Sequence, residues 1–267
     1  MRYTVPVSEE EKRSPLYKYF LRELAPAPQE KYDAIAKGPM DPKDALQAPD
    51  LNRLFDPGYL PGEFGWWVLP DGTGTIANCT AMPNVTVEMF DWWFAWHGVQ
   101  PMRYKIWDPE DHFYCQTRNM DQALDASLSM KERYWNTTHD VKESMLGDGE
   151  EHASNIVISF RNPADIGFDP EKLKSFKGTI VCTGDEHPVI MCHFVRPLES
   201  GGIELRTRFW FGYGVIGGKP VKLLPEGMKI PEKQMVDLLT HNVREYTNMA
   251  AILPEVYAEF KDQFAPF

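Results

Sequence analysis

The stretch EKQMVDLLTHNVREYTNMAAIL, residues 232–253, repeats apolar side chains at helical spacing and predicts a long C-terminal helix. With 3.6 residues per turn, the apolar stripe through Leu238 and Met249 also passes through His241 and Glu245. An imidazole and a carboxylate therefore lie on the face that the helix should bury. Two polar groups on a buried face suggest a functional site.

Composition limits what this function can be. The chain has 267 residues, 43% of them hydrophobic and 25% charged, which is typical of a soluble globular protein of one or two domains. Its 39 acidic residues outnumber its 28 basic ones, for a net charge of −11, and no cluster of Lys and Arg is evident. Binding to a phosphate backbone needs such a cluster, so we expect no nucleic-acid partner.

Neither a membrane-spanning run nor a hydrophobic signal-peptide core is evident, so we expect a cytoplasmic protein without membrane contact. The four cysteines form no CxxC pair, and reduced thiols are the simplest interpretation. Their positions are Cys79, Cys115, Cys182 and Cys192.

The pattern along the chain predicts two parts. Residues 1–60 are rich in proline and charge, and we interpret them as an N-terminal arm or small helical subdomain. Residues 61–267 form the main domain, in which residues 84–98 predict a helix capped by Asn84. Beyond residue 100, alternating apolar runs predict strands at 102–107, 112–117, 131–141, 155–160, 178–183, 188–195 and 202–215.

Many antiparallel strands, few helices and a long C-terminal helix indicate an α+β fold. A curved antiparallel sheet wrapped around the last helix would satisfy this pattern, and the buried face of the helix would then look into an enclosed cavity. Because His241 and Glu245 lie one turn apart, they could bind one metal ion together, and zinc accepts both ligand types. A solvated pair or a hydrogen-bonded core pair would show the same spacing.

Two further stretches resemble a known enzyme family. WWFAWHGVQPMRYKIWDPEDHF, residues 92–113, and HNVRE, residues 241–245, resemble the zinc-dependent family of 2,4-diacetylphloroglucinol and phloretin hydrolases. The resemblance runs from about residue 60 to the C-terminal helix. It implies a helix-grip fold like that of the Bet v 1 and START proteins, cleavage of the carbon–carbon bond between an aromatic ring and an acyl carbonyl, and a homodimer.

The resemblance also implies a metal site and a substrate site. The metal ligands, with zinc as the ion, would be His112, Glu143, His241 and Glu245. Iron or manganese would suit the same ligand types. The residues that orient the phenols and move protons would be Tyr104, His193 and Tyr213, with Glu143 or Glu245 as a base. Where the family can present an asparagine to the substrate, this chain has Cys115.

The remaining histidines have plainer interpretations. His97 is expected in the core or behind a ligand, whereas His139, His152 and His187 lie in polar stretches and are expected to be solvated. Cys115 is expected to be inert, because no base near it is evident in the sequence.

Together these features predict a zinc hydrolase that converts an acylated polyphenol, such as an acylphloroglucinol or a phloretin-like ketone, into a phenol and a carboxylic acid. Two alternatives stay open. The same cavity could bind an aromatic or lipid ligand without a metal, or a real metal site could serve a cyclase or decarboxylase that acts on a polyketide-like phenol.

Overall fold

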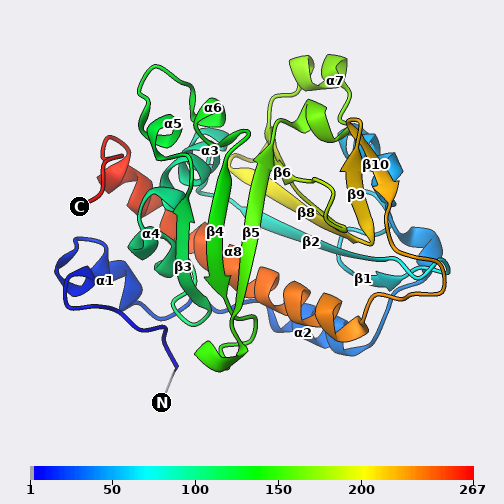
Figure 1. The fold of residues 1–267 in the computed structure, drawn as a ribbon, viewed down its shortest axis with the longest axis horizontal. Coiled ribbons are helices and arrows are strands. Elements are labelled where there is room, and N and C mark those ends of the chain that lie inside the picture. The colour runs from blue at the N-terminus through cyan, green and yellow to red at the C-terminus, as the bar shows by residue number, and fades with distance from the viewer. Residues whose placement is uncertain (1–2) are drawn as a thin grey trace. The chain divides into compact units, whose positions relative to one another are not determined.

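The computed structural model describes residues 3–267. The chain divides into two compact units (Figure 1). The first contains Met1–Ala27, Asn84–Ser159 and Arg244–Phe267, and the second contains Pro28–Pro83 and Phe160–Val243. Within the described part of the chain, no helix has both the length and the apolar character that crossing a membrane requires.

Two elements continue from one unit into the other, the strand β5 (Ser154–Arg161) and the C-terminal helix α8 (Glu232–Phe260). The other elements of the first unit are η1 (Glu11–Arg13), α1 (Tyr17–Phe20), α3 (Val87–Trp96), η4 (His97–Val99), α4 (Pro101–Lys105), β3 (His112–Thr117), α5 (Met120–Leu124), α6 (Met130–Tyr134), β4 (Thr138–Glu143) and η5 (Glu150–His152).

The second unit contains most of the strands. Its helices are α2 (Gln29–Ala36), η2 (Pro42–Asp44), η3 (Ala48–Phe55), η6 (Pro163–Ile166) and α7 (Pro170–Ser175). Its strands are β1 (Gly65–Val68), β2 (Gly74–Met82), β6 (Thr179–Thr183), β7 (Val189–Pro197), β8 (Ile203–Phe211), β9 (Tyr213–Ile216) and β10 (Lys219–Lys222).

Eight strands form one antiparallel sheet in the order β1-β2-β8-β7-β6-β5-β4-β3, and β9 pairs with β10 in a separate ribbon. The long helix α8 is continuous through its 29 residues and is the orange-to-red helix in Figure 1. The prediction of an α+β, helix-grip fold is confirmed in these elements, a large antiparallel sheet and a long C-terminal helix.

Two of the predicted strands are wrong. Residues 101–105 form the helix α4, because Pro101 occupies the first helical turn, where its missing N–H costs nothing. Residues 130–134 form the helix α6, which a capping box begins: the side chain of Ser129 accepts the N–H of Glu132, and the carboxylate of Glu132 reaches back to Ser129. The strand that was expected from residue 131 starts only at residue 138, as β4.

The tryptophan-rich helix was predicted with the wrong cap. Thr86, not Asn84, accepts the backbone N–H of Met89 through its side chain, so α3 begins at Val87. Its aromatic residues are buried as expected, and the rings of Trp92 and Trp96 stack with their centroids 4.6 Å apart. The helix is a packed element of the core of the first unit.

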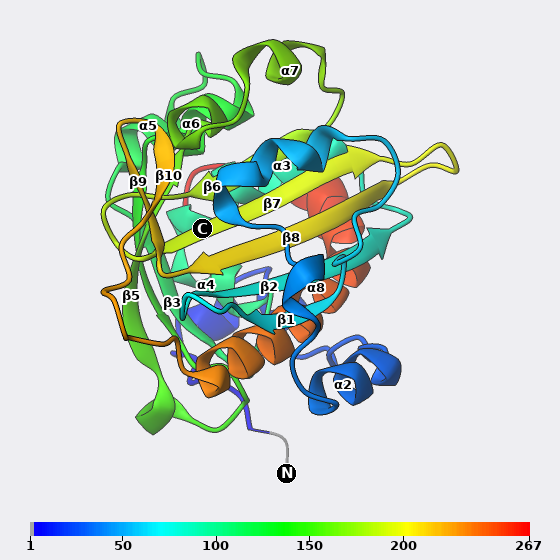
Figure 2. The ribbon, with the colours of Figure 1, turned by 90° about the vertical axis from the view of Figure 1, so that its right-hand side faces the viewer.

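In the second unit, one face of the sheet is covered by the segment that contains η3. Figure 2 shows this blue segment lying across β7 and β8. Leu51 and Leu54 are buried in one cluster with Phe194 of β7 and Trp210 of β8, and the indole N–H of Trp210 donates to the carbonyl of Leu46 at 2.7 Å. Burial of these large side chains holds the segment on the sheet.

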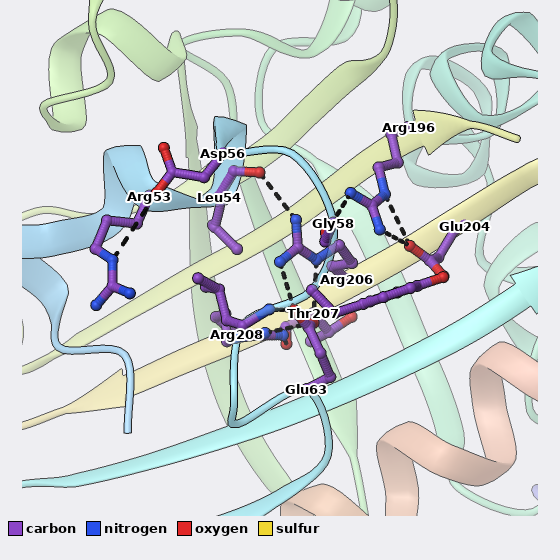
Figure 3. Close-up of polar contacts among 12 residues, drawn as sticks. Arg53, Leu54, Asp56, Gly58, Glu63, Arg196, Glu204, Arg206, Thr207 and Arg208 are labelled. Atoms are coloured by element: carbon purple, nitrogen blue, oxygen red, sulfur yellow. Dashed lines mark hydrogen bonds and ion pairs between the residues drawn. The ribbon is translucent and has the colours of Figure 1, made fainter. Parts of the chain in front are cut away.

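A cluster of charged residues adjoins this hydrophobic cluster. Arg206 and Arg208 are fully buried on β8, and both donate to the carboxylate of Glu63 (Figure 3). Arg206 also donates to the carbonyl of Leu54 at 2.9 Å. Although burial raises the pKa of Glu63, the two guanidinium groups outweigh it and lower this pKa to about 2. The one ionised carboxylate thus forms ion pairs with both buried guanidinium groups.

This charged cluster predicts that the free energy of unfolding depends on pH. Because the folded state lowers the pKa of Glu63, its contribution is fully present above about pH 4.5 and is lost as the pH falls toward 2. We expect Glu63→Gln to lower the free energy of unfolding at neutral pH by about 3 kcal/mol. Urea titrations between pH 7 and 3 measure this, with the exposed Glu171→Gln as the control, and an unchanged midpoint for Glu63→Gln would contradict the role of this carboxylate.

Candidate metal centre

The candidate centre starts where two neighbouring strands meet in the first unit. His112 is the first residue of β3, and its register partner is Glu143, the last residue of β4. Both side chains are buried, with exposures of 0% and 8%. The β3–β4 ladder thus brings together an imidazole and a carboxylate that lie far apart in sequence.

The ring of His112 is held from two directions. It stacks on the ring of Tyr104 with the centroids 3.8 Å apart and the planes at 2°. Its Nδ1 lies 3.2 Å from the backbone carbonyl of Tyr104, which can only accept, so the proton of the imidazole is on Nδ1. The lone pair on Nε2 then faces Oε2 of Glu245, 3.7 Å away.

Two acceptor atoms that face each other in a buried place can hold a cation between them. A distance of 3.7 Å is too long for a direct hydrogen bond. Two ligand atoms that each lie about 2 Å from one tetrahedral ion would be roughly 3.3 Å apart. A histidine whose other ring nitrogen donates to a backbone carbonyl is also the usual state of a metal-bound imidazole. His112 and Glu245 therefore fit a bound metal ion.

Helix α8 presents Glu245 through fixed hydrogen bonds. The indole N–H of Trp107 donates to the backbone carbonyl of Glu245 at 3.0 Å, and the side-chain amide of Asn248 donates to the carbonyl of Trp107 at 2.8 Å. His241 precedes Glu245 by one turn of the same helix and is also buried, at 2% exposure. The helical repeat therefore puts its imidazole on the face that carries Glu245.

Tyr104 connects the carboxylate of Glu143 to this group. Its hydroxyl donates a hydrogen bond to Oε2 of Glu143. Burial, and then the nearby charge of Glu143, raise the pKa of Tyr104 well above its ordinary value. At neutral pH the phenol thus keeps its proton and acts as a donor.

Three charged residues that the sequence analysis did not single out anchor the site. Arg244 donates through Nε to Asp108 at 2.9 Å and through its terminal nitrogen to Asp111. Asp108 also accepts the backbone N–H of His112 through its carbonyl, at 2.9 Å. Their signal was present in the sequence, since WDPEDH and HNVRE contain these residues next to His112 and Glu245.

The structure places the two other predicted substrate residues in the second unit, on opposite faces of its sheet. His193 of β7 is buried, with its Nδ1 3.0 Å from the hydroxyl of Thr207, and burial lowers its pKa to about 3. Tyr213 instead packs in the hydrophobic cluster with Cys192 and Phe194, the two neighbours of His193. Because side chains alternate along a strand, His193 points away from that cluster.

The expectations for the remaining histidines are partly wrong. His152 and His187 are exposed, as expected. His139, however, is buried at 3% exposure, and its Nδ1 lies 3.7 Å from Sγ of Cys115. The thiol of Cys115 therefore has an imidazole beside it. The sequence did not reveal this neighbour, because it is the alternation of side chains along β4 that points His139 inward.

Known proteins are similar to this chain over most of its length. The family model of the DAPG hydrolase PhiG domain matches residues 46–258. The chain belongs to this family. It is 38% identical to the phloretin hydrolase of Eubacterium ramulus, over 97% of this chain and 95% of that protein. It is 29% identical to a 2,4-diacetylphloroglucinol hydrolase of a Pseudomonas species, over 93% of this chain and 89% of that protein.

Solved structures show weaker similarity. A protein from Chromobacterium violaceum has 13% identity and a TM-score of 0.37, covering 67% of this chain and 97% of its own. Ara h 8.0201 has 10% identity and a TM-score of 0.35, covering 70% of this chain and 99% of its own. Similarity at this level says nothing about the activity of this chain.

The buried His193 predicts a second pH effect. Because the folded state lowers its pKa to about 3, the unfolded chain binds its proton first, and stability is lost as the pH falls below about 6.5. We expect His193→Gln to flatten this loss by up to about 1.4 kcal/mol per pH unit. Urea titrations from pH 7 to 4.5 measure the free energy of unfolding of wild type, His193→Gln and the control His187→Gln, which replaces an exposed imidazole. If this free energy changes equally with pH in all three proteins, the prediction is refuted.

Proposed function

We propose that this protein is a metal-dependent hydrolase that cleaves the carbon–carbon bond between a polyhydroxylated aromatic ring and an acyl carbonyl. The observation that carries the proposal is the pair of facing acceptors on His112 and Glu245, with Glu143 beside them, in a family whose relatives are named phloretin hydrolase and 2,4-diacetylphloroglucinol hydrolase. The products would be a phenol and a carboxylic acid.

The donor set suits zinc. His112, Glu143 and Glu245 would hold the ion, together with His241 one turn before Glu245. When bound, zinc supplies a Lewis acid for the acyl carbonyl and activates water near neutral pH. The relatives' names state the hydrolysis but not the metal, so the ion is part of the proposal.

The reaction also demands protons at defined places. An aryl carbanion is too unstable to leave, so the ring must first be protonated at the carbon that bears the acyl group, which ring hydroxyls permit through a keto tautomer. Tyr104 keeps its phenolic proton and donates a hydrogen bond to Oε2 of Glu143. This pair can therefore hold a ring hydroxyl by a hydrogen bond and pass a proton between Oη of Tyr104 and the carboxylate of Glu143.

An assay of products tests the proposal directly. Purified protein is incubated with phloretin and, separately, with 2,4-diacetylphloroglucinol, and the phenol and the carboxylic acid are measured by chromatography. We expect equal amounts of both products from at least one substrate, loss of turnover with a chelator, and recovery with added zinc. Binding of either ketone without a carboxylic acid product would support a binding protein instead, and release of carbon dioxide would support a decarboxylase.

One substitution tests the metal ligands. His241→Ala removes a proposed ligand from α8, so we expect turnover to fall to background and bound zinc to be lost, while the circular dichroism spectrum is kept. The matched control is His187→Ala, which removes an exposed imidazole far along the chain from α8. Full zinc content and activity in His241→Ala would exclude this residue from the site.

A second substitution tests the phenol. Tyr104→Phe removes one hydrogen bond and keeps the ring that stacks on His112. We expect kcat/KM to fall roughly ten- to a hundredfold, which corresponds to about 1–3 kcal/mol of transition-state stabilisation. Zinc content should stay the same, because the phenol is not a proposed ligand. Unchanged kinetics would place substrate binding elsewhere, and a loss of zinc would make Tyr104 part of the metal's own coordination.

A further inference from the structure

A second group of potential metal ligands lies in the first unit, separate from the centre described above. The buried face of β4 carries His139, Val141 and Glu143 in alternation. Glu143 belongs to the candidate centre, and His139 lies four residues before it, about 13 Å along the strand. Cys115 of β3 and His97, at the end of α3, are the neighbours of His139.

The three side chains converge in a buried place. One ligand atom from each of His97, Cys115 and His139 lies within 4.8 Å of the others, and their exposures are 3%, 0% and 3%. Gly98 lets the backbone approach this closely, because a Cβ at that position would lie only 2.3 Å from Cε1 of His139. The contact with Gly98 fixes the ring of His139 in its orientation.

Hydrogen bonds on the outer side of the cluster set the tautomers of both histidines. Nδ1 of His97 lies 3.0 Å from the carbonyl of Trp93 and must donate to it, so the lone pair of His97 is on Nε2. The hydroxyl of Thr137 donates to the carbonyl of Tyr134 at 2.6 Å. Because its single proton is used in that bond, the hydroxyl of Thr137 can only accept from Nε2 of His139, which lies 3.5 Å away.

The proton of His139 is then on Nε2, and its lone pair on Nδ1 faces Sγ of Cys115 at 3.7 Å. Two ligands of one tetrahedral zinc ion, a sulfur and a nitrogen, would be roughly 3.6 Å apart. Backing of a ligating imidazole by a carbonyl or a hydroxyl is the arrangement that surrounds metal-bound histidines. The outer hydrogen bonds of this cluster thus have the form that a metal site needs.

Burial keeps both imidazoles in the state that binds metal. It lowers the pKa of His97 to about 4 and that of His139 well below its ordinary value, so both rings are neutral. It also raises the pKa of Cys115 well above its ordinary value. The thiol is therefore protonated until a cation replaces its proton.

We infer that His97, Cys115 and His139 bind a second metal ion, a zinc ion with two imidazole ligands, one thiolate and one position left for a further ligand. Binding breaks the S–H bond of Cys115, forms one sulfur–metal bond and releases one proton to solvent. The soft thiolate separates this site in kind from the first, whose ligands are nitrogen and carboxylate oxygen. This inference does not depend on the proposed hydrolysis.

The alternative is a neutral hydrogen bond from the thiol of Cys115 to Nδ1 of His139, without a metal. Sulfur forms long hydrogen bonds, so the distance alone is compatible with it. The two interpretations differ in metal content and in spectrum, because only a coordinated thiolate transfers charge to a metal.

Metal content in four proteins separates the two sites. Wild type, His241→Ala, Cys115→Ser and the double variant are dialysed against trace zinc, and bound zinc is measured by mass spectrometry. We expect two ions per chain in wild type, one in each single variant and none in the double variant. If Cys115→Ser binds as much zinc as wild type, the inference is overturned. If His241→Ala binds as much as wild type while Cys115→Ser loses an ion, the second site stands and the first fails.

Cobalt substitution gives a readout that does not need a variant to fold. Cobalt-loaded wild type should show a thiolate-to-cobalt charge-transfer band in the near ultraviolet, and its absence would overturn the inference. The band should disappear in Cys115→Ser and in His139→Gln. It should persist in Cys79→Ser, which removes a thiol outside the cluster.

Discussion

Two carboxylates and an imidazole lone pair are buried together in the first unit, and this is the constraint on which the site depends. Removing an ionised carboxylate from water costs several kcal/mol even after the protein relaxes, unless a cation or donors replace the water. Tyr104 supplies one donor to Glu143, but His112 turns an acceptor toward Glu245. The proposed metal ion would resolve this arrangement, because it accepts a lone pair from both ligand types.

The ion pairs of Arg244 connect helix α8 to the loop before β3. Arg244 lies directly before Glu245 on α8, and it binds Asp108 and Asp111, which lie four residues and one residue before His112. A shift of the helix would therefore move the loop with it, and the ligands would keep their spacing. Sites whose ligands are fixed in this way hold their geometry before the ion arrives. In both segments the anchoring residue is therefore next in sequence to a proposed ligand: Asp111 to His112, and Arg244 to Glu245.

Much of the fold followed from periodicity, but some elements did not. The stretch 102–107 alternates apolar and polar residues like a strand, and only Pro101 at its start favours the helix that forms. His139 has polar neighbours in sequence, yet the alternation of β4 turns it inward. Tyr213 follows Gly212, whose φ of 87° ends the alternation of β8, so its face could not be predicted from that strand.

The site was predictable only in part for a related reason. The spacing of His241 and Glu245 is local and visible in the sequence, whereas the pairing of His112 with Glu143 depends on the register of two strands. Resemblance to the family supplied that long-range information. The cluster around His139 lacked both kinds of signal, because its members come from a helix end and two strands.

The central claim is that these buried ligands bind a metal ion. A crystal structure of the purified protein, with anomalous diffraction recorded above and below the zinc absorption edge, tests it most directly. The account predicts an anomalous peak about 2 Å from Nε2 of His112 and from oxygens of Glu143 and Glu245, with His241 as the further ligand. A zinc-supplemented crystal without a peak there, in which His112 and Glu245 share a direct hydrogen bond, would contradict it.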